Sequence, residues 1–172
     1  MRVPLLKQAI ILFRDSERSM NDQPELAAVR SVPADELEAL YSSVGWVAYT
    51  RDLPGLEQAI ANSTYVVTAR ITGQLVGLAR AVSDDVSIFY LQDILVRPDH
   101  QHRGIGRALA RNCLNRFAHV RSRVLLTDDL PSQHRFYESM GYRDTRRITN
   151  IALHAFVQID GVDLQTDSES DA

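Results

Sequence analysis

The chain has little of what marks a secreted or membrane protein. It contains a single cysteine, Cys113, so no disulfide can form within it, and redox chemistry does not mark its compartment. No hydrophobic run approaches the length of a transmembrane helix. The longest apolar run near the start, residues 9–13, is too short for the core of a signal peptide, and no small-residue cleavage site follows it. We therefore expect a cytoplasmic protein with no membrane partner.

The chain also lacks a large excess of charge of either sign. The formal net charge is −3, and five of the 22 acids lie in the tail after Ile159, which carries no base. The remaining 17 acids face 19 bases, and a body so near neutrality excludes a broad nucleic-acid-binding surface. The bases are 18 arginines and one lysine, Lys7. Arginine favours bidentate contacts with phosphate and carboxylate groups.

Length and composition predict one domain with two flanking segments. A chain of 172 residues, of which 45% are hydrophobic, is sufficient for one packed core. Residues 1–24 have no clear period and are expected to form an extension of uncertain structure. Residues 160–172 are acidic and polar, and this composition predicts disorder. The domain itself is assigned to residues 25–159.

Periodicity predicts an α+β fold. Alternating or β-branched runs favour strands, and apolar residues spaced three and four apart favour helices. Turn residues between successive apolar runs indicate an antiparallel meander. The expected strands are 25–32, 64–71, 75–82, 87–96, 123–127 and 149–158, of which 123–127 is expected to be buried. The expected helices are 34–44, 55–62, 104–120 and 132–140. The result is a mixed, mostly antiparallel sheet flanked by helices.

The most informative segment is residues 91–106. An apolar strand leads into a turn with Gly104 and Gly106, and a helix pattern follows at once. The start of a helix offers unpaired N–H groups and the positive end of the helix dipole, which together bind phosphate. Two glycines alone also fit a plain strand-to-helix turn. The dinucleotide-binding fingerprint is excluded because position 109 is Leu, and no Lys–Ser/Thr pair follows that would make a P-loop.

Two motifs together resemble a known family. The run Gln-His-Arg-Gly-Ile-Gly at 101–106 resembles the Q/R-x-x-G-x-G/A pyrophosphate loop of the GNAT superfamily of acetyl-CoA-dependent N-acetyltransferases. The run Phe-Tyr-Glu-Ser-Met-Gly-Tyr at 136–142 resembles the F-Y-x-x-x-G-F/Y segment of the same superfamily. The resemblance covers about residues 25–158. It implies a GNAT-like fold in a single domain and transfer of an acetyl group to an amine by direct attack in a ternary complex.

The resemblance implies a site for acetyl-CoA as co-substrate. In the superfamily, the strand residues matching 94–96 bind the pantetheine arm through their backbone, and the loop matching 101–106 holds the pyrophosphate. Arg103 and Arg107 fit this reading on charge, because cations are disfavoured at a helix start unless an anion offsets them. The expected cofactor-binding residues are Ile94, Leu95, Val96, Gln101, His102, Arg103, Gly104, Ile105, Gly106 and Arg107. No metal is expected, since His100-x-His102 lacks a third ligand.

The catalytic residues are less clear from the sequence. The resemblance implies that Tyr137 protonates the departing thiolate, although a core aromatic at this position would fit equally well with the helix pattern. In superfamily members with a clear general base, the base often lies on the matching strand of the meander, at the position of Tyr90 or Gln92. Neither of these residues is acidic. Strand alternation points Asp93 to the opposite face, unless a bulge turns it. Asp93 is thus either a base or a structural carboxylate whose hydrogen bonds are satisfied. A water relayed by Gln92 and Tyr90, with no dedicated base, is a third possibility.

The acceptor side rests on a few residues. Trp46 and Tyr49 lie in the loop after the first helix and either contact the acceptor or pin that loop to the core. Asp128 and Asp129 are rival bases and would attract a cationic amine. Members of the superfamily often have an Asn just before the F-Y segment. This chain lacks that Asn and has Leu130 near the corresponding position, so one contact with the CoA arm is in doubt. The expected acceptor-binding residues are Trp46, Tyr49, Tyr90, Asp128 and Asp129, and the expected catalytic residues are Tyr137, Gln92 and Asp93.

These observations predict an N-acetyltransferase that acts on a small-molecule amine. Two alternatives stay open at this point: a protein or peptide N-acetyltransferase, and a non-catalytic module that senses acyl-CoA. The lack of an obvious base on the meander strand favours the second alternative. The oligomeric state stays open, and a homodimer fits. Cys113 falls on the apolar stripe of its helix and is expected to pack in the core rather than act as a nucleophile.

Overall fold

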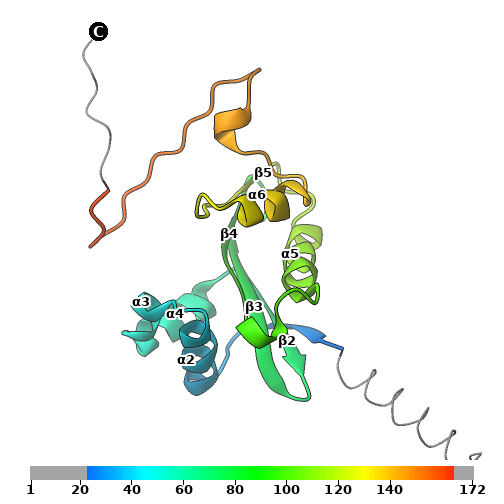
Figure 1. Cartoon of the computed structure of the whole chain (residues 1–172), viewed down its shortest axis with the longest axis vertical. Coiled ribbons are helices and arrows are strands. Elements are labelled where there is room, and N and C mark those ends of the chain that lie inside the picture. Colours follow the sequence, from blue (N-terminus) through cyan, green and yellow to red (C-terminus); the bar gives the residue numbers. More distant parts are fainter. Residues whose placement is uncertain (1–22, 165–172) are drawn as a thin grey trace, which may run out of the picture. The chain divides into compact units, whose positions relative to one another are not determined.

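The computed structural model describes residues 23–164 and divides into two compact units that meet at Thr127 and Asp128 (Figure 1). Most of the expected N-terminal extension and the end of the expected acidic tail, residues 165–172, lie outside the described residues.

A five-stranded sheet forms the first unit, in the order β1-β2-β3-β4-β5. Its strands are β1 (Glu25–Val29), β2 (Tyr65–Ile71), β3 (Gln74–Ser83), β4 (Ile88–Val96) and β5 (Ser122–Val124). The first four pair antiparallel, and β5 runs parallel to β4. The β2–β3 connection consists of Thr72 and Gly73, both at positive φ, which is the geometry of a two-residue hairpin turn. The expected meander is therefore confirmed.

Helices cover both faces of the sheet, as Figure 1 shows. On one side lie α2 (Ala34–Ser43), α3 (Val47–Thr50) and α4 (Leu53–Asn62); on the other lies α5 (Ile105–Arg116). Leu37 and Leu40 of α2 are fully buried in a core cluster with residues of β2, β3 and β4. Asp52 caps α4 by accepting a hydrogen bond from the Gly55 N–H at 3.0 Å.

The face under α5 has its own packed layer. Ile105, Leu109 and Cys113 of α5 are buried, and Phe117 after the helix packs on Phe89 of β4 with ring centroids 5.1 Å apart. Burial raises the pKa of the Cys113 thiol to about 12, so the thiol stays protonated at neutral pH. Cys113 is a packing residue, as its place on the helix stripe predicted.

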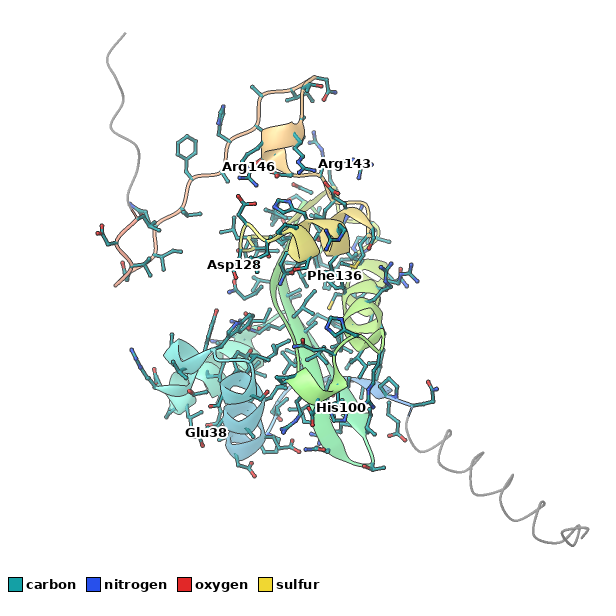
Figure 2. All side chains as sticks on the ribbon, viewed as in Figure 1. Glu38, His100, Asp128, Phe136, Arg143 and Arg146 are labelled. Carbon is teal, nitrogen blue, oxygen red and sulfur yellow. The ribbon has the colours of Figure 1, made fainter. Side chains whose placement is uncertain are left out.

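The second unit holds α6 (Pro131–Glu138) and the short 3₁₀ helix η2 (Thr145–Arg147). Gly141 follows α6 at φ +96°, and its N–H donates to the Glu138 carbonyl at 3.0 Å, which ends the helix. Arg146, labelled in Figure 2, bridges the carboxylates of Asp129 and Asp144. These pairs hold η2 against the segment before α6.

Three expectations about the elements are wrong. Residues 149–158, expected to form a final strand, are irregular and exposed, because an alternating pattern forms a strand only where a partner strand supplies hydrogen bonds. The strand expected at 123–127 shrinks to β5, whose residues are exposed rather than buried. The long helix ends at Arg116 rather than 120, where Phe117 leaves helical geometry at φ −113°.

Candidate active site

The start of α5 presents unpaired backbone donors. The first helical hydrogen bond runs from the Ala108 N–H to the Gly104 carbonyl at 3.0 Å, so the amides of residues 104–107 have no partner within the helix. Gly104 is the N-cap residue, and no side chain caps the helix there. Residues 101–104 are exposed. An uncapped, solvent-facing helix start of twelve-residue α5 is suited to an anionic group.

The loop before α5 depends on its backbone geometry. Gly104 has φ +83°, a region that L-residues rarely occupy, and a Cβ built there meets no atom within 4 Å. His102 also has positive φ, at 61°. The Gln101 side chain donates from Nε2 to the Val96 carbonyl at 2.9 Å, which ties the loop to the end of β4. The loop and the strand end are thus held together as one surface.

Arg103 and Arg107, at the start of α5, have no counter-charge in the part of the chain described. The first turn of α5 contains no acid, and neither Arg103 nor Arg107 forms an ion pair with another described residue. Arg107 in the first turn opposes the helix dipole, at a typical cost of about 0.3–1 kcal/mol. A bound anion would remove this mismatch.

The β4 strand has an open edge beside this loop. Only Ile88, Phe89 and Tyr90 pair with β5, so residues 91–96 have no strand partner on that side among the described residues. Ile94 is half-buried, and Leu95 and Val96 are buried. A free strand edge accepts an extended ligand through backbone hydrogen bonds. The residues expected to bind the pantetheine arm are therefore next to the helix start expected to bind the pyrophosphate.

A β-bulge interrupts β4 at Gln92. Arg80 pairs with Asp93 and Ala81 pairs with Leu91, which leaves Gln92 as the extra residue. Phe89 therefore packs on the α5 side, whereas Asp93 contacts Tyr41 of α2 on the other side. Simple alternation, which placed Asp93 on the face opposite Gln92, is wrong here, and the bulge reading is confirmed.

Asp93 is buried and fully engaged at one oxygen. Its side chain is 1% exposed, and Oδ2 accepts hydrogen bonds from Nε of Arg80 and from the Tyr41 hydroxyl, the latter at 2.8 Å. Burial lowers the pKa of Arg80, but the charge and hydrogen bond of Asp93 outweigh it and leave that pKa raised. Burial, followed by the Asp93 charge, raises the pKa of Tyr41, so its hydroxyl stays a donor.

An aromatic cluster adjoins the bulge. Trp46 stacks on Tyr49 at 5.8 Å between centroids, and Tyr41 packs against both rings, at 6.0 and 5.4 Å. Trp46 and Tyr49 are part-buried against the core, and the Gln92 side chain donates from Nε2 to the Tyr49 hydroxyl at 3.3 Å. Burial raises the pKa of Tyr90, with smaller contributions from Tyr49 and Asp93. The structure thus brings Gln92, Asp93, Trp46, Tyr49 and Tyr90 together.

The remaining expected site residues belong to the second unit. Tyr137 lies on α6 and contacts Phe136 and Tyr142 edge-on, at 5.1 and 6.1 Å between centroids. Figure 2 labels Asp128, which is exposed. Asp129 binds Arg146 and His134, and these partners, Arg146 first, lower the pKa of Asp129. Their roles in catalysis and acceptor binding stay predictions.

Sequence reasoning missed two members of the buried network, Arg80 and Tyr41. Arg80 is a charged residue inside the apolar run of β3, and a charge in a buried strand requires a partner. That signal was present in the sequence but named no partner. In the described part of the chain, no three His, Cys, Asp or Glu side chains gather to hold a metal, and no helix is long and apolar enough to cross a membrane.

Comparison with known proteins gives the family. The model of the acetyltransferase (GNAT) family matches residues 31–142. The chain belongs to the GNAT family. The match crosses the boundary between the two compact units, so both contribute to one family domain. The fold class expected from the sequence and the acetyl-CoA-dependent acyltransferase activity are both confirmed, with acetyl-CoA as the co-substrate that the family uses.

Individual relatives agree with this assignment. The chain is 26% identical over 140 residues to an uncharacterized N-acetyltransferase, ycf52, of Pyropia yezoensis, and the match covers 79% of each chain. The GNAT family acetyltransferase SP0256 of Streptococcus pneumoniae has the same fold at TM-score 0.64 and 29% identity, covering 77% of this chain and 98% of that one. The fold also matches AAC(6')-Iy, solved with a CoA-linked acetylneamine bisubstrate analog, at TM-score 0.56 and 15% identity, with 78% of this chain and all of that one covered.

Proposed function

We propose that this GNAT acetyltransferase transfers the acetyl group of acetyl-CoA to the amine of a small molecule, by direct attack in a ternary complex. We assign the catalytic domain to residues 25–159. The observation that carries the proposal is the uncapped start of α5 beside the open edge of β4, with Gly104 held at positive φ between them. This surface combines donors for a diphosphate with a strand edge for an extended arm.

The cofactor residues divide into three groups. The backbone of Ile94, Leu95 and Val96 binds the pantetheine arm, and the loop 101–106 binds the pyrophosphate through its amides. Arg103 and Arg107 add charge beside the phosphates, because neither has a partner among the described residues. Because most of these contacts come from the backbone, His102 and Ile105 contribute through position more than through side-chain chemistry.

The transfer requires a neutral amine and an acid for the leaving group. The neutral amine nitrogen attacks the thioester carbonyl carbon and then loses a proton to solvent, so that an amide forms. The C–S bond breaks, the Tyr137 hydroxyl gives its proton to the thiolate, and the tyrosinate regains a proton from solvent. An alkylamine is protonated at neutral pH, and lowering its pKa by about three units costs about 4 kcal/mol. We assign the removal of the amine's proton to a water held by Gln92 and Tyr90, which passes the proton to solvent. General acid–base help of this kind typically contributes about 10²–10⁴-fold.

The acceptor side supports a small molecule. Gln92 of β4 and the stacked rings of Trp46 and Tyr49 form a contiguous polar and aromatic surface at the bulge. Such rings hold a cationic amine by their faces. AAC(6')-Iy, which shares the fold, is solved with a bisubstrate analog that joins CoA to an acetylated neamine, and this complex supports both direct transfer and a small acceptor.

The test is an acceptor screen. The purified full chain is incubated with acetyl-CoA and, separately, with a panel of small amines and a panel of lysine-containing and free-N-terminus peptides, and the release of CoA thiol is followed. Turnover of small amines supports the proposal. Turnover of peptides alone would replace it with protein acetylation. Tight CoA binding by calorimetry without thiol release from any acceptor would leave the sensing alternative.

A further inference from the structure

A second role for the buried charges follows from where they lie, and it rests on the proposed function. Tyr41, Arg80 and Asp93 come from three elements, α2, β3 and β4, and meet at the point where β4 bulges. Arg80 of β3 and Asp93 of β4 are cross-strand partners, and their pair lies directly next to the bulge at Gln92. We propose that this network positions the acceptor side of the site and that Asp93 does not itself take the proton of the acceptor.

Burial argues against a proton-accepting Asp93. The carboxylate is 1% exposed, and protonating it would leave the Arg80 guanidinium, itself buried, without its counter-charge. A buried charge that loses its partner is strongly destabilising. The second oxygen, Oδ1, is buried and has no hydrogen-bond partner among the described residues, so it is the only atom through which Asp93 could act as a base.

The network reaches the acceptor surface through Tyr41. Its hydroxyl binds Asp93, while its ring packs edge-on against Trp46 and against Tyr49. Tyr49 in turn accepts a hydrogen bond from Gln92, the bulged residue. The chain of contacts therefore closes around the bulge: Asp93 holds Tyr41, Tyr41 supports the stacked rings, and the rings hold Gln92. Tyr41 and Arg80 are positioning residues, since they act through these side chains.

Two variants test the proposal, with one matched control. Tyr41→Phe removes the hydroxyl and leaves the Arg80–Asp93 pair intact. Asp93→Asn keeps the shape and removes the charge. The control is Tyr65→Phe, which also removes a hydroxyl with a hydrogen bond, to Asn112 at 2.7 Å, on the opposite side of the sheet. Each protein is assayed with acetyl-CoA and the panel amine that has the highest kcat/KM, and the fluorescence of Trp46, the only tryptophan, is quenched with acrylamide.

The expected result is a split between KM and kcat. Tyr41→Phe should raise the acceptor KM by about tenfold, the effect of losing one hydrogen bond to a charged group, with kcat within about threefold. The KM for acetyl-CoA should not change. Asp93→Asn should shift the acceptor KM in the same direction and leave the acidic limb of the pH profile of kcat/KM in place. Quenching of Trp46 should increase in both variants and stay unchanged in Tyr65→Phe.

Two outcomes would overturn the inference. In the first, Asp93→Asn folds but loses kcat by about a hundredfold or more together with the acidic limb, which is the signature of a base. In the second, Tyr41→Phe leaves both the acceptor KM and the quenching of Trp46 at wild-type values. If Asp93→Asn does not fold, Tyr41→Phe decides alone. If no acceptor is acetylated, the proposed function fails, and the fluorescence still decides whether the network holds Trp46 in place.

Discussion

Two glycines with the same geometry allow the cofactor loop to be tested cleanly. Gly104 at the start of α5 and Gly73 in the β2–β3 turn both have φ +83°, and a Cβ built on either meets no atom within 4 Å. Alanine at either position therefore meets the same backbone strain and no clash. Only Gly104 lies where the diphosphate of CoA is expected. The pair Gly104→Ala and Gly73→Ala separates backbone strain from ligand binding.

The magnitudes follow from the backbone. Placing an L-residue in the left-handed region costs about 1–2 kcal/mol, so both variants should unfold at a lower temperature, by roughly 2–8 °C for a chain of this size. In Gly104→Ala, the added methyl group also lies beside the amides that we expect to hold phosphate. Losing one hydrogen bond to a charged group costs about 1.5–3 kcal/mol, which is a roughly ten- to hundredfold increase in the Kd for CoA. Gly73→Ala should bind CoA like the unmodified chain.

The assay combines thermal unfolding without ligand and titration calorimetry with coenzyme A. The reasoning holds if the two variants lose similar stability and only Gly104→Ala loses affinity. It is refuted if Gly104→Ala binds CoA as tightly as Gly73→Ala, since the phosphate would then not meet these amides. Unequal losses of stability would show that the strain at one turn is relieved by a change in its backbone.

Three further predictions use other parts of the structure. Arg107→Gln should raise the unfolding temperature without ligand, because it removes a cation from the first turn of α5. The same change should weaken CoA binding and make that binding less dependent on salt. Thermal unfolding and calorimetry at two ionic strengths measure these effects, and a loss of stability with unchanged affinity for CoA would contradict the prediction. Tyr137→Phe should lower kcat by about 10²–10⁴-fold with the Kd for CoA unchanged, and full turnover would remove its role as acid. Cys113 is buried, and burial raises the pKa of its thiol from its ordinary value of 9.0 to about 12, so the folded enzyme should not react with a thiol reagent at pH 8. Between pH 9.0 and about 12 the unfolded chain loses this proton before the folded chain does, so Cys113 lowers the stability of the fold as pH rises through this range. Cys113→Ala should therefore lose less free energy of unfolding over this range than the unmodified chain in unfolding titrations.

The fold could be predicted from the sequence where local signals suffice. The meander is marked by turns such as Thr72–Gly73, whose positive φ values suit a hairpin, and the helices by apolar spacing. The failures share one cause. Residues 149–158 alternate like a strand, and β5 was expected to be longer and buried, but whether a strand forms depends on which partner lies beside it. Local pattern does not contain that information.

The cofactor side and the acceptor side of the candidate site also differed in how far local sequence could predict them. The proposed cofactor loop is contiguous, and its expected chemistry comes from backbone amides at one helix start, so the sequence motif and the family resemblance were enough to propose it. The proposed acceptor side draws on α2, α3 and β4, and the hydrogen bond between Tyr41 and Asp93 spans 52 residues of sequence. The bulge at Gln92 also changes which face Asp93 occupies, and no residue type in β4 marks it.

A charged residue inside an apolar strand was nevertheless a usable signal. Arg80 sits in a β3 run whose neighbours are buried, and a guanidinium there must find a carboxylate. Asp93 is the one acid of the adjacent strand β4. Counting back from the β3–β4 turn pairs Arg80 with Gln92, one residue short of Asp93, so the pair Arg80–Asp93 departs from the simple register. That pairing is compatible with the other contacts of β4 only if the strand gains one residue. The buried ion pair therefore both requires the bulge and fixes it, which is why we assign Asp93 to positioning and leave the proton to Gln92, Tyr90 and water.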